Sequence, residues 1–126
     1  MLNSEKNILI IDYQIGNVSS VINAVKKLGY KVKLSNKKDE FNKASHLILP
    51  GVGSFEAGMA NIVKSGIKDI IIDHVINKKI PILGICLGMQ LFATEGSENA
   101  EGNQNKTVTK GLNLIEGEVK KLESKS

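Results

Sequence analysis

The 126-residue sequence predicts an α/β fold, an open and mostly parallel sheet with helices on both faces. Two observations support this. Short apolar runs alternate with segments whose apolar residues recur at helical spacing, the order typical of βαβ units. In addition, glycine-rich turns at 50–53 and 84–88 each follow an apolar run. Because the strands of such units run parallel, we expect both turns, which follow strands, to open at the carboxyl edge of the sheet, where sites form.

The elements follow from these patterns in order. Continuous or alternating apolar runs that stop at turn residues predict four strands, at 7–13, 30–34, 47–49 and 80–85. Helical spacing predicts helices between them, with Gly29 and Gly66 as stops, at 18–28, 55–64, 67–76 and 87–93. Phe41 and Ala44 suit a short helix or turn. We therefore expect one domain, 1–126, whose first part is regular α/β structure.

The pattern changes after residue 93. Residues 94–110 are polar, rich in Gly, Asn and Glu, and without an apolar period, which predicts a loop. Residues 112–119 suggest a further strand or a hairpin around Gly117, and 121–126 form a polar tail.

Composition narrows the class of protein. Hydrophobic residues make up 41% and charged residues 24%, as in ordinary globular proteins. The net charge of +4 is spread over scattered lysines, which favours a solvated surface over a nucleic-acid interface. The longest mainly apolar stretch, 80–93, falls short of the roughly 18 residues of a membrane span. We expect a cytoplasmic protein with no membrane or nucleic-acid partner.

The single cysteine excludes an intrachain disulfide and a cysteine-based metal cluster. His46 and His74 lie at no metal-ligand spacing, so no metal or cofactor is predicted. His46 precedes a strand and would lie at its amino end, away from the expected site. His74 falls inside a helix among isoleucines, which favours a structural or surface role for it.

Cys86 lies in a G-x-C-x-G pattern directly after an apolar run, which is the pattern of a nucleophile elbow. Flanking glycines remove the Cβ atoms that would clash in so tight a turn. The positive end of the following helix favours a thiolate, and we expect the backbone N–H of Leu87 to be free to bind an oxyanion. A lone cysteine is more often a small buried hydrophobe, and its place at the sheet edge is what favours function.

Three segments in this order and spacing resemble class I glutamine amidotransferases: Ile11-Asp12-Tyr13 with Gly16-Asn17, LPGVGSF at 49–55, and GICLGMQ at 84–90. The PGVGSF segment makes the glutaminase subunit of imidazole glycerol phosphate synthase the most similar member. The resemblance implies a flavodoxin-like fold without a cofactor. It also implies hydrolysis of glutamine to glutamate and ammonia, with ammonia passed to a cyclase subunit in histidine biosynthesis.

The resemblance assigns the chemistry to four matching positions. Cys86 corresponds to the nucleophile that attacks the amide carbon of the glutamine side chain and forms a γ-glutamyl thioester. Leu87 N–H corresponds to one oxyanion donor. Val52 or Gly53 would offer the second donor through the backbone.

Further positions correspond to residues that contact glutamine or the partner. Gly51 belongs to the same oxyanion and substrate-binding set, and Gln90 and Gly53 would hold the glutamine. Gln90 lies three residues past Leu87 and can return to the same helix end. Asn17 would lie near the interface with the cyclase partner.

The chain departs from the family in two places. Gln14 stands where the family usually has glycine, so a positive φ there would be strained. The family also carries its catalytic His and Glu on a C-terminal segment that this chain does not match, so it resembles the first two-thirds of a glutaminase. We therefore expect negligible activity from these residues alone, and exposed sheet surface that such a segment would cover.

Three alternatives remain open. A glutaminase of this kind could instead serve a sugar-amination enzyme in surface polysaccharide synthesis. A redox sensor or chaperone could use the same thiol elbow, although this does not explain PGVGSF or Gln90. A nucleotide-binding domain could use glycines of 51–58, but the loop does not match G-x-G-x-x-G and no G-K-[ST] follows.

Overall fold

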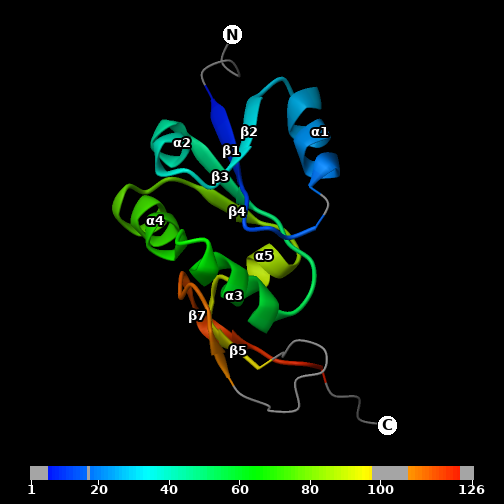
Figure 1. The fold of residues 1–126 in the computed structure, drawn as a ribbon, viewed down its shortest axis with the longest axis vertical. Helices are drawn as coiled ribbons and strands as arrows, with labels where there is room; N and C mark the ends of the chain where they lie inside the picture. Colours follow the sequence, from blue (N-terminus) through cyan, green and yellow to red (C-terminus); the bar gives the residue numbers. More distant parts are fainter. Residues whose placement is uncertain (1–5, 17, 98–107, 123–126) are drawn as a thin grey trace.

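A computed structural model describes residues 6–16, 18–97 and 108–122 of the chain (Figure 1). Its main sheet has four parallel strands in the order β2-β1-β3-β4. The strands are β1 (Asn7–Ile11), β2 (Lys31–Ser35), β3 (His46–Leu49) and β4 (Ile82–Gly84). Helices connect consecutive strands, so the predicted α/β fold with an open parallel sheet is confirmed.

Helices cover both faces of this sheet. Figure 1 shows α1 (Ser19–Lys27) on one side of the strands, and α2 (Lys38–Lys43) and α4 (Lys68–Ile72) on the other. Helix α3 (Phe55–Lys64) begins after the turn that follows β3, where Ser54 Oγ accepts a hydrogen bond from Ala57 N–H at 3.1 Å. This bond satisfies one of the N–H groups that a helix start leaves without a partner.

Successive apolar side chains of β1 and β3 alternate between two cores, one on each face of the sheet. Leu9 and Leu47 face the larger core, which α2, α3 and α4 cover, whereas Ile10 and Ile48 face Val25 of α1. Successive side chains of a strand point to opposite faces, so a continuous apolar run is the pattern that a sheet covered on both sides requires. The predicted buried strands are confirmed for this reason.

Two predicted helices differ in detail from the expectation. The helix predicted at 67–76 is present, but its second half is a π-helical turn, η2 (Asp73–Asn77), that continues α4. The helix predicted at 87–93 is only α5 (Leu87–Gln90), because the chain then enters a strand at Ala93.

That strand belongs to a second, smaller sheet in the order β6-β5-β7. Its strands are β5 (Ala93–Gly96), β6 (Thr109–Lys110) and β7 (Ile115–Val119), with β7 parallel to β5 rather than folded into a hairpin. The loop predicted at 94–110 is therefore wrong at both ends, and 98–107 lie outside the described residues. These strands have no apolar pattern because they pack on Phe55 through glycine backbone. A Cβ at Gly96 or Gly111 would come within 3 Å of the Phe55 ring.

No helix in the described part of the chain is both long and apolar enough to cross a membrane.

Candidate active site at the carboxyl edge of the sheet

The two glycine-rich turns meet at the carboxyl edge of the main sheet, as predicted. Ile85 N–H donates to the Leu49 carbonyl at 3.0 Å, and Leu87 N–H donates to the Gly51 carbonyl at 3.1 Å. The turn after β3 and the turn after β4 are therefore joined by backbone hydrogen bonds. This brings 50–53 against 84–88.

Cys86 occupies the turn between β4 and α5 in a backbone conformation that L-residues rarely adopt. Its φ is +52° and its ψ is −120°. Such a conformation is strained in a residue with a Cβ, and strained residues cluster at functional sites. The thiol is free and exposed. The predicted sharp turn is thus present, and it presents the sulfur to solvent.

Gly84 and Gly88, which flank the Cys86 turn, stand where no side chain would fit. A Cβ at Gly84 would lie 2.7 Å from Met89 N, and a Cβ at Gly88 would overlap the Leu49 carbonyl. Real Cβ atoms are essentially never this close to backbone. The expectation that both glycines permit the turn is confirmed.

The expectation that Leu87 N–H is free is wrong. This N–H donates to the Gly51 carbonyl at 3.1 Å, which fills the position that an oxyanion would need. The physical reason is the closeness of the two turns, since a backbone donor beside a backbone carbonyl pairs with it when water does not reach both. In this arrangement the Leu87 N–H is therefore paired with the opposite turn.

Tyr13 holds the 50–53 turn, which carries the Gly51 carbonyl. Its buried hydroxyl donates a hydrogen bond to the Pro50 carbonyl, and a Cβ at Gly51 would overlap the same hydroxyl. Burial raises the pKa of the Tyr13 phenol well above its ordinary value. Sequence reasoning used Tyr13 only as part of a motif, although a buried tyrosine directly after a strand needs a hydrogen-bond partner.

The remaining predicted site residues lie around this pair of turns. Val52 is exposed, and Gly53 has a φ of +107° with open space where a Cβ would stand. Gln90 is half-buried in α5, and its N–H donates to the Cys86 carbonyl at 3.3 Å. The structure thus brings Gly51, Val52, Leu87 and Gln90 to one end of the sheet with Cys86.

Two positions near strand β1 complete the comparison with the sequence. Gln14 has a φ of +62°, so the strained backbone expected there is present, and its N–H donates to Asp12 Oδ1 at 3.2 Å. The predicted interface residue Asn17 lies outside the described residues.

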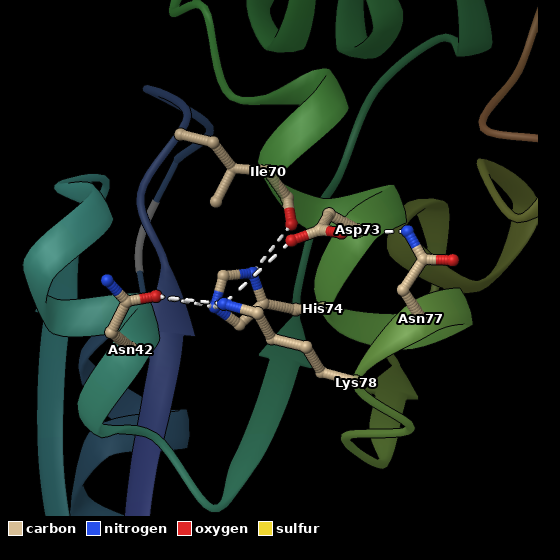
Figure 2. Close-up of polar contacts among 6 residues, drawn as sticks. All are labelled: Asn42, Ile70, Asp73, His74, Asn77 and Lys78. Atoms are coloured by element: carbon tan, nitrogen blue, oxygen red, sulfur yellow. Dashed lines mark hydrogen bonds and ion pairs between the residues drawn. The ribbon is translucent and has the colours of Figure 1, made fainter.

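His74 is a structural residue. It is 2% exposed, its Nδ1–H donates to the Ile70 carbonyl at 2.8 Å, and its Nε2 lies 3.1 Å from Asn42 Oδ1 (Figure 2). Its ring packs at 5.4 Å from the Phe41 ring, between centroids. Nδ1 is therefore paired with α4, and Nε2 lies beside Asn42 Oδ1 of α2 and, at 3.5 Å, beside the Lys78 ammonium, which can donate to it.

Neither histidine is placed to serve Cys86. His46 is the first residue of β3, with its Nδ1 2.9 Å from Ser45 Oγ, and the His74 carbonyl accepts the N–H of Ile80, ahead of β4. Both lie toward the amino ends of the strands, whereas Cys86 follows the carboxyl end of β4. Within 6–16, 18–97 and 108–122, no three His, Cys, Asp or Glu side chains gather as metal ligands.

Comparison with known proteins identifies relatives over almost the whole chain. Residues 9–125 match the family model of class-I glutamine amidotransferases. Imidazole glycerol phosphate synthase subunit HisH 1 of Campylobacter jejuni is 43% identical over 116 residues, which are 92% of this chain and 54% of the relative. The HisH subunit of Streptococcus mutans is 42% identical over 119 residues, 94% of this chain and 55% of the relative. The chain thus spans about half the length of these relatives.

Solved structures show the same fold. A crystal structure of a glutamine amidotransferase aligns with a TM-score of 0.67 and 23% identity, over 89% of this chain and 55% of that one. A putative peptidase E protein from Listeria monocytogenes aligns with a TM-score of 0.71 and 14% identity, over 90% of this chain and 64% of that one. At these identities the likeness extends to the fold alone.

Proposed function

The chain belongs to the class-I glutamine amidotransferase family, and on that premise we propose that it carries the nucleophile and the oxyanion loop of a glutaminase. In this proposal, residues 1–126 belong to one amidotransferase domain that hydrolyses glutamine to glutamate and ammonia. The observation that carries it is the conformation of Cys86, an exposed thiol held at φ +52° between two glycines that nothing larger can replace. A buried structural cysteine needs no such turn.

The proposed reaction has two steps. The Cys86 thiolate attacks the amide carbon of the glutamine side chain, a C–S bond forms, and the C–N bond breaks as ammonia leaves with an added proton. Water then hydrolyses the thioester to glutamate and restores the thiol. Both steps pass through a tetrahedral oxyanion, which backbone N–H groups stabilise when they point at the oxygen.

The hydrogen bond between Leu87 N–H and the Gly51 carbonyl suggests how the loop would act. The peptide unit whose carbonyl accepts from Leu87 joins Gly51 to Val52, so its other end is the N–H of Val52. Rotation of this one peptide would free Leu87 N–H and turn Val52 N–H toward the same space. Val52 is exposed and Gly53 has open space where a Cβ would stand, so the packing that opposes the rotation lies on the Gly51 side, against the Tyr13 hydroxyl. We propose these two N–H groups as the oxyanion donors.

The relatives' names support a partner. HisH proteins are named as subunits of imidazole glycerol phosphate synthase. We propose that the ammonia passes to the cyclase subunit of that enzyme in histidine biosynthesis. In this arrangement Gly51, Gly53 and Gln90 hold the glutamine, and Asn17 belongs to the interface with the partner.

Glutamine binding tests the proposal. The probe is the Cys86→Ser chain, which cannot form a thioester, observed by saturation-transfer NMR of free glutamine. We expect transfer to glutamine that weakens in the additional Gln90→Ala variant, and no transfer to asparagine, whose side chain is one methylene shorter. Equal transfer to both amino acids, or to neither, would contradict a glutamine site at this elbow.

A further inference from the structure

The side chain of Tyr13 lies where two neighbouring parallel strands end. Strands β1 and β3 are paired in the sheet (Figure 1), and their register, continued past the strand ends, sets Tyr13 beside Gly51. The Tyr13 hydroxyl donates a hydrogen bond to the Pro50 carbonyl, and the same oxygen fills the space that a Cβ at Gly51 would need. One buried oxygen therefore contacts the turn at two consecutive residues.

The backbone around Tyr13 is itself held in place. Asp12 N–H donates to the Ser35 carbonyl of β2 at 3.1 Å, which continues the contact between β1 and β2 by one residue. Gln14 N–H donates to Asp12 Oδ1 at 3.2 Å, and Gln14 has a φ of +62° in this short turn. Burial raises the pKa of the Tyr13 phenol, so the hydroxyl keeps its proton and stays a donor. Tyr13 is thus a fixed point beside the turn.

The boundary between buried and exposed backbone falls within the same turn. Pro50 and Gly51 are buried, whereas Val52 is exposed. The Pro50–Gly51 peptide is bound to Tyr13 through its carbonyl. The next peptide, Gly51–Val52, joins the buried part to the exposed part, and its carbonyl accepts the hydrogen bond from Leu87 N–H. Rotation of this single peptide is therefore the smallest change that releases Leu87 N–H.

We propose that Tyr13 is a positioning residue for the oxyanion donors, because its hydroxyl anchors the Pro50–Gly51 peptide and leaves only the Gly51–Val52 peptide free to rotate. The anchored side then brings Val52 N–H and Leu87 N–H to the same space, instead of the whole turn moving. Without the hydroxyl, the buried Pro50 carbonyl loses its donor, and the turn shifts toward conformations in which this carbonyl finds another. The inference rests on the proposed function, since oxyanion chemistry is what needs this pair of donors.

Amide hydrogen exchange of the 126-residue chain tests the anchoring without glutamine. In Tyr13→Phe, we expect Leu87 N–H to exchange about tenfold faster or more, because the turn that accepts its hydrogen bond opens more often. Ile85 N–H is the internal control, since it donates to the Leu49 carbonyl before the turn, and should change by less than about twofold. Tyr30→Phe removes the hydroxyl of the only other tyrosine and should change neither rate.

Two outcomes of the exchange measurement would overturn the proposal. Equal acceleration at Leu87 and Ile85 would show a general loss of stability, and no acceleration at either would show that the hydroxyl does not hold the turn. If Tyr13→Phe does not fold, Gly51→Ala takes its place, because the new Cβ displaces the hydroxyl from the same position. Gly51→Ala should speed exchange at Leu87 more than at Ile85, and equal acceleration would again contradict the anchoring.

A second measurement separates the anchoring from the proposed function. The chain is treated with a diazo ketone that mimics glutamine and, in parallel, with iodoacetamide, and the ratio of the two rates at Cys86 gives a selectivity. We expect Tyr13→Phe to lower this selectivity by about tenfold, because converging backbone donors hold the carbonyl of a glutamine mimic and iodoacetamide needs none. Unchanged selectivity in a variant with faster Leu87 exchange would overturn the positioning role. If glutamine does not slow the diazo ketone in the unaltered chain, the proposed function fails, and the exchange rates still decide whether Tyr13 holds the turn.

Discussion

At Cys86, the local sequence pattern predicted the backbone turn but not every hydrogen bond around it. The G-x-C-x-G pattern predicted both the turn and the need for its glycines, because these depend on atoms within a few residues of each other. The pattern could not predict that Leu87 N–H is occupied. That bond depends on the Gly51 carbonyl, which lies 36 positions earlier in the sequence and reaches the elbow only through the sheet.

Replacing Gly88 tests the packing of the elbow. We expect Gly88→Ala to lower the free energy of unfolding by about 3 kcal/mol, because its Cβ would overlap a backbone carbonyl that cannot move aside. Gly66→Ala is the control, with a φ of +74° but open space, and should cost about 1 kcal/mol. Urea unfolding of both variants gives the comparison. A Gly88→Ala midpoint at or above that of Gly66→Ala would show that the elbow is not tightly packed.

The buried phenol of Tyr13 should make the folded chain less stable at alkaline pH. Burial raises the pKa of its phenol above the unfolded value of about 10. Above that pH the unfolded chain releases its proton first, so the folded state binds more protons and stability falls as pH rises. Below pH 10 the contribution is fully present. Tyr13→Phe should remove this part of the alkaline slope, measured by urea unfolding between pH 9 and pH 11; an unchanged slope would show that Tyr13 does not resist ionisation.

At the scale of elements, local periodicity predicted the strand and helix order but not the ends of the helices. The π-helical turn η2 follows α4 at the point where the His74 ring donates a hydrogen bond to the Ile70 carbonyl. In this turn the Lys78 N–H donates to the carbonyl of Asp73, five residues earlier. Strands β5 and β6 of the small sheet were missed because their segments are polar and glycine-rich, whereas β7 lies in the strand suggested at 112–119. Gly96 and Gly111 pack on Phe55 through backbone, a contact that leaves no apolar pattern in the sequence.

The two histidines should differ in their effect on stability. His74→Ala removes a buried ring and its hydrogen bonds between α2 and α4, so we expect a loss of about 2–3 kcal/mol. His46 lies at the amino end of β3, so His46→Ala should lower the free energy of unfolding by less than about 0.5 kcal/mol. Urea unfolding measures both. Neither substitution should change the rate at which iodoacetamide modifies Cys86, and a slower rate in either would assign that histidine to the site.

At the scale of the whole molecule, the parallel sheet and the meeting of both turns at its carboxyl edge were predictable, because strands joined through helices run parallel and end at the same edge. The chain does not bring a histidine to the elbow within its described residues. Leu83 of β4 is exposed, and only its register with Ile48 and Ile10 shows that it lies on the α1 face of the sheet.

The same arrangement predicts the activity of the 126-residue chain. Without a general base beside the nucleophile, catalysis falls by several orders of magnitude. We expect the purified chain to release ammonia from glutamine no faster than its Cys86→Ser variant, in a coupled assay with glutamate dehydrogenase. Steady, Cys86-dependent release would contradict this placement of the histidines.

The most direct test of the central claim is the intact mass of the chain after treatment with a diazo ketone that mimics glutamine. Because Cys86 is the only cysteine, we expect one adduct, located at Cys86, whose formation glutamine slows and asparagine does not. Iodoacetamide, which needs no glutamine site, is the control for thiol reactivity. Modification at the same rate with and without glutamine would contradict the claim that this elbow is a glutamine-directed nucleophile.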